Sequence, residues 1–275
     1  MMSHFICATC GTQFAATEAP PKRCDICEDD RQYVGQGGQK WMTLDDLRAS
    51  YHNVIREVEP ALTGIGTHPS FAIGQRALLV QTPEGNLLWD CITVLDDPTI
   101  AAVRALGGVD AIAISHPHYY SCMVEWAQAF EATIYLHEAD QRWVMRPDPS
   151  ITFWEGKTKL LFGNLTLICA GGHFPGGTVA HWPAGAEGRG VLLTGDIIHV
   201  VADRRYVTFM YSYPNMIPLP ERAVRGVVEA VEPFGYDRIY GAWWEKVMAK
   251  KAREGVAFSA ERYVRAIRGA EQPDE

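Results

Sequence analysis

Apolar and polar residues follow one another along this chain in short runs that predict strands interleaved with helices. Residues 76–82 and 86–92 are apolar-rich and flank Pro83-Glu84-Gly85, a pattern typical of a β-hairpin. Residues 109–115 form a short apolar run, as expected for a buried strand. Beyond it, apolar residues recur at i, i+3, i+4 and i+7, which predicts an amphipathic helix. These are Met123, Trp126, Ala127 and Phe130.

The alternation continues through the second half of the chain. Residues 159–162 and 165–169, joined at Gly163-Asn164, predict a second hairpin, and residues 191–194 predict another buried strand. Pro220 suits the first position of a helix, which carries valines on one face. A last helix is expected over residues 260–267. Strands that alternate with helices predict an α/β fold.

The first 40 residues have too few large apolar side chains to fold on a hydrophobic core alone. They contain the pattern C-x2-C-x13-C-x2-C, formed by Cys7, Cys10, Cys24 and Cys27. In a reducing compartment this spacing is typical of tetrahedral Zn²⁺, and bound zinc would supply the missing stability. We predict a zinc ribbon with rubredoxin-like knuckles over residues 1–40. A capping box at residues 43–46 then opens the main domain, residues 41–275.

Composition narrows the class of protein. The 275 residues suffice for one large α/β domain and a small module. The net charge of −8 argues against nucleic acid and anionic membranes as partners. No stretch approaches the roughly 20 apolar residues of a membrane span, and the start of the chain has no secretion signal. We expect a soluble cytoplasmic protein that acts on a small molecule, with homo-oligomerisation left open.

Three histidines and an aspartate follow predicted strands. In an extended segment, residues i and i+2 project to the same side, so His116 and His118 are expected to converge on one ion. Pro117 biases His116 toward that conformation. His173 lies among glycines, which let the backbone turn closely, and Asp196 follows a Gly. Three imidazoles and a carboxylate suit Zn²⁺ with room for a water, and Fe²⁺ accepts the same ligands.

The order and spacing of these residues resemble the metallo-β-lactamase fold. The chain has HxH after a strand, a glycine-flanked histidine about 55 residues later and Gly-Asp about 23 residues beyond that. The resemblance covers roughly residues 60–245 and implies an αβ/βα four-layer sandwich with its site on loops. It implies that His116, His118 and His173 bind the first metal, with Asp196 at the bridging position. Asp90 matches an aspartate that supports the site.

The ligands that the family usually has for a second metal are missing from this sequence. The family continues HxH with x-Asp-His, where this chain has Tyr120 and Ser121, and residues 240–244 contain no late histidine. We therefore predict a mononuclear site. Tyr120 is interpreted either as a packing residue or as a hydrogen-bond donor to a developing oxyanion. Ser121 is interpreted as the N-cap of the following helix.

Several other polar residues are interpreted as structural. His137, His181 and His199 fall in this group, with support of a second ion as the alternative for each. Arg204-Arg205 is expected to be a solvated loop, or else a contact for an anionic substrate. Aromatic residues in the connections are mostly core, and part of this set is expected to wall an apolar substrate pocket.

The leading hypothesis is a metal-dependent hydrolase that activates water for attack on an ester, thioester, lactone or amide carbonyl. Asp196 would serve as a ligand and proton acceptor. Relatives that cleave phosphodiesters normally use two metals, which argues against that branch. One alternative is a mononuclear iron oxidoreductase of the sulfur dioxygenase type.

The other alternative is a binding protein whose zinc ribbon contacts a partner and whose main site is vestigial. Residues 1–40 carry five acidic and four basic residues, so nucleic acid is not the expected partner of the ribbon. Docking on its own catalytic domain or on another protein is expected instead.

Overall fold

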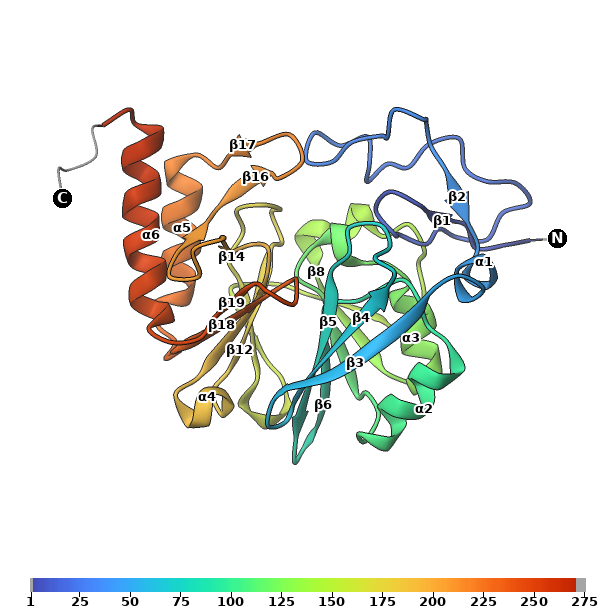
Figure 1. Ribbon diagram of the computed structural model, residues 1–275, viewed down its shortest axis with the longest axis horizontal. Helices are drawn as coiled ribbons and strands as arrows, with labels where there is room; N and C mark the ends of the chain where they lie inside the picture. Colours follow the sequence, from blue (N-terminus) through green and yellow to red (C-terminus); the bar gives the residue numbers. More distant parts are fainter. Residues whose placement is uncertain (1, 271–275) are drawn as a thin grey trace. The chain divides into compact units, whose positions relative to one another are not determined.

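The structure, a computed structural model, describes residues 2–270. The chain divides into two compact units, residues 1–154 and 155–275. Each unit is built on one mixed sheet (Figure 1). Within residues 2–270, no helix is both long enough and apolar enough to cross a membrane.

The first unit contains a seven-stranded sheet in the order β3-β4-β5-β6-β7-β8-β9. The strands are β3 (His52–Glu59), β4 (Leu62–His68), β5 (Arg76–Thr82), β6 (Gly85–Trp89), β7 (Ala111–Ala113), β8 (Thr133–His137) and β9 (Ile151–Trp154). β3 to β6 pair antiparallel, and β6 to β9 pair parallel. The hairpin predicted around Pro83-Glu84-Gly85 is therefore confirmed as β5 and β6.

Helices and short helical turns connect the parallel strands of this sheet. They are α2 (Asp97–Ala105), η1 (Pro117–Tyr119), α3 (Met123–Phe130) and η2 (Glu138–Trp143). The side chain of Asp96 caps α2 by accepting from the backbone N–H of Thr99. α3 spans the predicted amphipathic segment and packs against β7 and β8. This packing fixes the loop between β7 and α3, which carries His116 and His118.

The four-cysteine module belongs to the first unit. Its short strands β1 (Ile6–Cys7) and β2 (Trp41–Met42) pair antiparallel. Helix α1 (Leu44–Arg48) follows, and the predicted capping box is present between Thr43 and Asp46. The chain divides into compact units after residue 154, so the domain boundary expected at residues 40 and 41 stays a prediction.

The second unit contains a six-stranded sheet in the order β10-β11-β12-β13-β18-β19. The strands are β10 (Thr158–Leu160), β11 (Thr166–Cys169), β12 (Thr178–Trp182), β13 (Val191–Gly195), β18 (Arg238–Gly241) and β19 (Val247–Met248). Two small ribbons accompany them: β14 (His199–Val200) with β15 (Val207–Thr208), and β16 (Met210–Ser212) with β17 (Ile217–Pro218). The remaining elements are η3 (Phe162–Asn164), α4 (Gly185–Gly188), α5 (Glu221–Val231) and α6 (Ala252–Ile267).

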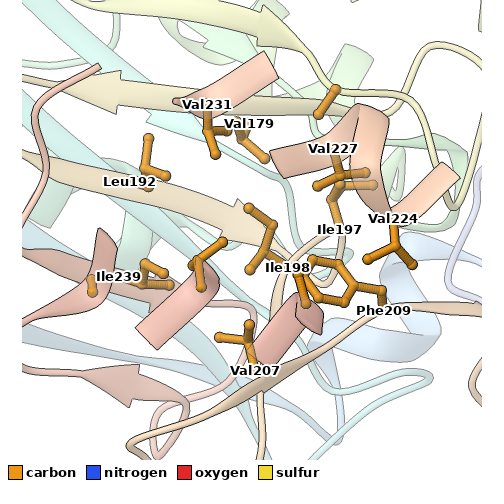
Figure 2. Close-up of a cluster of buried hydrophobic side chains, with 14 of the residues drawn as sticks. Val179, Leu192, Ile197, Ile198, Val207, Phe209, Val224, Val227, Val231 and Ile239 are labelled. Atoms are coloured by element: carbon orange, nitrogen blue, oxygen red, sulfur yellow. The ribbon is translucent and has the colours of Figure 1, made fainter. Parts of the chain in front are cut away.

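The core of the second unit lies between its sheet and helices α5 and α6. Val224, Val227 and Val231 of α5 are fully buried with Leu192 and Ile239 of the sheet (Figure 2). The valine face that the sequence predicts is thus the face that packs. α6 begins earlier than predicted. Gly255 lies in its first turn and interrupts the helical pattern of the sequence there. Glycine is needed at this position because a Cβ added to Gly255 would lie 2.8 Å from the Sδ of Met248.

Candidate metal centres

The four cysteines of the N-terminal module form a compact cluster. All four are buried, and their Sγ atoms lie within 4.8 Å of one another. The Sγ atoms of Cys7 and Cys27 are 3.5 Å apart, and those of Cys10 and Cys24 are 3.6 Å apart. Four thiolates about 2.3 Å from a tetrahedral Zn²⁺ lie roughly 3.8 Å from one another, so the spacing fits zinc.

Local hydrogen bonds shape this cluster as a metal knuckle. The backbone N–H of Gly11 donates to the carbonyl of Cys7, and the backbone N–H of Thr9 lies 3.4 Å from its sulfur. The side-chain amide of Gln39 donates to the same sulfur. A thiolate accepts such donors, so the residues fit the metal that the sequence predicts.

The sequence predicts an extended segment at His116 and His118, but the histidine loop of the first unit is only partly extended. His116 is extended, with φ −171° and ψ 170°, but Pro117 starts the 3₁₀ turn η1, which contains His118. Pro suits this position because its fixed φ is already helical and it has no N–H to satisfy. The turn still brings the two imidazoles together, with ring centroids 5.0 Å apart. Both histidines are buried.

Two residues position His116. The hydroxyl of Ser115 lies 2.9 Å from Nδ1 of His116. The buried carboxylate of Asp90 accepts the backbone N–H of Ser115 at 2.8 Å. Burial raises the pKa of Asp90 to about 7, and the N–H of Ser115 acts in the opposite direction. Asp90 thus supports the histidine loop through Ser115, a residue that nothing in the sequence pattern identifies.

The two tyrosines after His118 are buried. The ring of Tyr119 packs against His116, with centroids 4.3 Å apart. Burial, with a smaller contribution from the carboxylate of Asp140, raises the pKa of Tyr120 well above its usual range. Tyr120 is therefore protonated at neutral pH. A protonated phenol can donate a hydrogen bond. The role of Tyr120 as donor to an oxyanion stays a prediction.

Ser121 is not the N-cap that the sequence analysis expected. Cys122 occupies the N-cap position of α3 and makes no side-chain cap. Ser121 instead has φ 45°, and its hydroxyl donates to the carbonyl of Cys91 at 3.3 Å. The side-chain amide of Gln75 donates to the same hydroxyl and to the same carbonyl. The N-cap interpretation of Ser121 was wrong because its hydroxyl bonds to partners distant in the sequence, among them Gln75, 46 residues away.

In the second unit, a tight glycine turn carries His173. Gly171 and Gly172 have φ of 67° and 79°, values that glycine adopts at low cost. The backbone N–H of Gly171 donates to the carbonyl of Gly177, which closes the loop. Nδ1 of His173 lies 3.0 Å from the carbonyl oxygen of Met210 on β16. The glycines thus form the close backbone turn that the sequence predicts, and the ion around which this turn is expected to close stays a prediction.

Asp196 follows β13 directly and is buried. The hydroxyl of Tyr213 donates to the backbone carbonyl of Asp196 at 2.8 Å. The same Tyr213 ring lies 5.8 Å from His173 and 4.9 Å from His199, between centroids. Burial, with a smaller effect of the Asp196 carboxylate, raises the pKa of Tyr213. Tyr213 therefore organises this part of the second unit, although the sequence gives no sign of that role.

The contacts of His137, His181 and His199 agree with a structural role, and support of a second ion stays the alternative for each. Nδ1 of His137 caps η2 by accepting the N–H of Ala139. Nε2 of His181 lies 2.8 Å from the carbonyl of Gly235. His199 packs 5.5 Å from Trp243, and burial lowers its pKa to about 4.

The double arginine after Asp196 is solvated. Arg204 pairs with Glu245 and Arg205 pairs with Asp203, and both arginine side chains are more than half exposed, at 57% and 77%. The loop interpretation of Arg204-Arg205 therefore agrees with the structure. Exposed ion pairs of this kind contribute little to stability.

Comparisons with known proteins show the family and the fold of this chain. The sequence profile of the metallo-beta-lactamase superfamily matches residues 72–243. A Bacillus subtilis (strain 168) protein, "Uncharacterized protein YmaE", is 52% identical over 268 residues, with 97% of each chain covered.

Solved metallo-beta-lactamases share the fold. DIM-1 has a TM-score of 0.57 at 12% identity, covering 77% of this chain and 98% of its own. FIM-1 from Pseudomonas aeruginosa, solved in a mono-zinc form, has a TM-score of 0.55 at 14% identity, covering 77% and 96%. These likenesses concern the fold alone, which is the metallo-beta-lactamase fold.

Proposed function

This chain belongs to the metallo-beta-lactamase superfamily, and we propose that it is a hydrolase whose main site works with one metal ion. The superfamily match spans the segments that contain all the predicted main-site ligands. We further propose that the four-cysteine cluster holds a structural Zn²⁺. The main ion is Zn²⁺ or Fe²⁺, because imidazole and carboxylate ligands accept both.

We propose that His116, His118 and His173 are the histidine ligands and that Asp196, which follows β13, completes the set. The hydrogen bonds within each unit support this assignment. Nδ1 of His116 is engaged by Ser115, and Nδ1 of His173 by the carbonyl of Met210. Metal-binding histidines usually place their second ring nitrogen against such a partner, which fixes the ring and leaves Nε2 for the ion.

The observation that carries the mononuclear proposal is the position of Ser121. In the superfamily this position usually supplies a histidine for the second ion. Here its hydroxyl is held between Gln75 and the carbonyl of Cys91, inside the first unit. A residue fixed in this way supports a site with one ion.

Zn²⁺ in such a site lowers the pKa of water and polarises a carbonyl oxygen. The chain supplies the other requirements of carbonyl hydrolysis. Asp196 is proposed to serve as a ligand and to accept the proton of the attacking water. Tyr120, a buried phenol two residues after His118, is proposed to donate a hydrogen bond to the oxygen on which negative charge develops.

The test is a hydrolysis assay with purified protein loaded separately with Zn²⁺ and with Fe²⁺. Ester, thioester, lactone and amide substrates are offered, and His118→Ala is the control. We expect at least one carbonyl substrate to be cleaved, and cleavage to be lost in the control. Oxygen consumption with a persulfide, together with iron in the purified protein, would favour the oxidoreductase instead. No turnover with either metal would favour a binding protein.

We also propose a reducing, cytoplasmic location and a small-molecule substrate. The two C-x2-C pairs of the ribbon suit zinc thiolates in a reducing compartment better than disulfides. The net charge of −8 disfavours nucleic acid as the substrate.

A further inference from the structure

The four-cysteine module is bonded directly to the histidine loop. The backbone N–H of Gln13 donates to the carbonyl of Ser121 at 3.0 Å. Ser121 lies three residues after His118 and immediately before the N-cap of α3. The chain leaves the loop in a left-handed conformation at Ser121. The module therefore holds the loop at the residue where its backbone is most unusual.

A partly buried polar cluster extends this contact to α3. The amide of Gln13 donates to Glu125, in the first turn of α3, at 3.2 Å. Arg146 donates to both Gln13 and Glu125, and its ion pair with Glu125 measures 2.6 Å. Gln13 is only 3% exposed. The Gln13 amide is shielded from water, and the side chains of the ion pair are partly shielded, at 11% exposed for Arg146 and 26% for Glu125, so these contacts constrain more than fully exposed pairs do.

The cysteine knuckle determines where Gln13 lies. Cys7 and Cys10 bracket a turn that continues through Gly11, whose φ is 81°. The hydroxyl of Thr93 donates to the carbonyl of Gly11. A Cβ added to Gly11 would lie 2.5 Å from the hydroxyl oxygen of Thr93, so only glycine fits here. Gln13 then forms an antiparallel bridge to Ile6, beside Cys7. Closing the cluster on a metal therefore fixes both ends of the segment that presents Gln13.

We propose that metal in the four-cysteine site holds the His116–His118 loop in its metal-binding conformation, with Gln13 as the positioning residue. The proposal rests on the proposed function and assigns the module a task in the same chain. Loss of the ribbon ion would release Gln13, then the carbonyl of Ser121 and the first turn of α3. The main site would then bind its ion more weakly without losing a ligand.

The test is a Co²⁺ titration of the full chain, because the two sites have different spectra. Tetrathiolate Co²⁺ shows strong sulfur-to-metal charge transfer, whereas a histidine and carboxylate site shows only weak visible bands. Gln13→Ala keeps the backbone bond to Ser121 and loses the side-chain contacts with Glu125 and Arg146. In this variant we expect an unchanged thiolate signal and a main-site affinity weaker by about three- to tenfold, the effect of losing a buried polar contact. The matched control is Gln128→Ala, which removes an exposed amide of α3 that bonds to Asp148.

Hydrogen exchange provides the second measurement. Residues 116–130 should exchange faster when the ribbon is emptied by Cys24→Ser, and also in Gln13→Ala with the ribbon filled. Main-site affinity and exchange that match the wild type in both variants would overturn the proposal. A wild-type chain that binds Co²⁺ only through thiolates would contradict the proposed function instead, and exchange alone would then decide the coupling.

Discussion

Ser121 has a structural task within the first unit. Its hydroxyl joins Gln75 to the carbonyl of Cys91 in a buried site. Ser121→Ala should lower the free energy of unfolding by about 1–2 kcal/mol, since one buried hydroxyl pairing is lost while the Gln75 bond to Cys91 remains. Urea unfolding measures this change. Metal content should stay at the wild-type value, and a lost ion would show that Ser121 is a ligand.

Asp90 should make stability depend on pH. Its folded pKa of about 7 lies above the value of about 3.9 for an unfolded aspartate. The folded state therefore binds more protons between these values, and stability falls as the pH rises through this window. The full effect is at most about 4 kcal/mol.

The variant Asp90→Asn cannot ionise and retains a carbonyl oxygen to accept the N–H of Ser115. Urea unfolding of metal-free protein between about pH 4 and 7 should give a flatter profile for this variant than for the wild type. Equal slopes in the two proteins would contradict the assigned pKa.

At the scale of elements, the turn between β11 and β12 holds His173 through glycines. An added Cβ on Gly172 would lie 2.9 Å from Cγ2 of Val227, and its φ is 79°. Gly172→Ala should therefore cost about 2–4 kcal/mol through backbone strain and crowding. The melting temperature and the zinc content should both fall.

Gly226→Ala is the matched control because Gly226 is exposed on α5 with no atom near an added Cβ. This substitution should stabilise the protein by about 0.5–1 kcal/mol, the helix propensity difference. Equal effects of the two substitutions would show that the turn at His173 is not constrained.

Elements with clear periodicity could be predicted from the sequence, and irregular ones could not. α3 was recognisable because Met123, Trp126, Ala127 and Phe130 keep helical spacing. β3 was not identified, because it is half exposed and mixes charged with apolar residues. Pro117 has two opposing effects on the loop. It favours an extended backbone at His116, which precedes it, and its own φ suits the first position of the turn η1. The sequence pattern shows only the first effect.

The candidate ligands themselves were identified by type and spacing. Their supports were not. The hydroxyl of Ser115 contacts His116, the amide of Gln75 contacts Ser121, and the hydroxyl of Tyr213 contacts the carbonyl of Asp196. Serine, glutamine and tyrosine also occur elsewhere in the chain without such a role, so their type alone does not identify them. Sequence distance hides these pairings, because only the folded chain brings the partners together.

For the whole molecule, we propose one ion in the ribbon and one ion in the main site. Three of the predicted main-site ligands are histidines, and the ribbon ligands are all cysteines. A substitution in one site should therefore remove one ion without removing the ligands of the other.

Elemental analysis of the purified full chain, with His116→Ala beside it, tests this claim most directly. The account predicts two ions per wild-type chain and one in the variant. Three ions in the wild type would contradict the mononuclear site. One ion that is unchanged by His116→Ala would contradict any metal at the histidines.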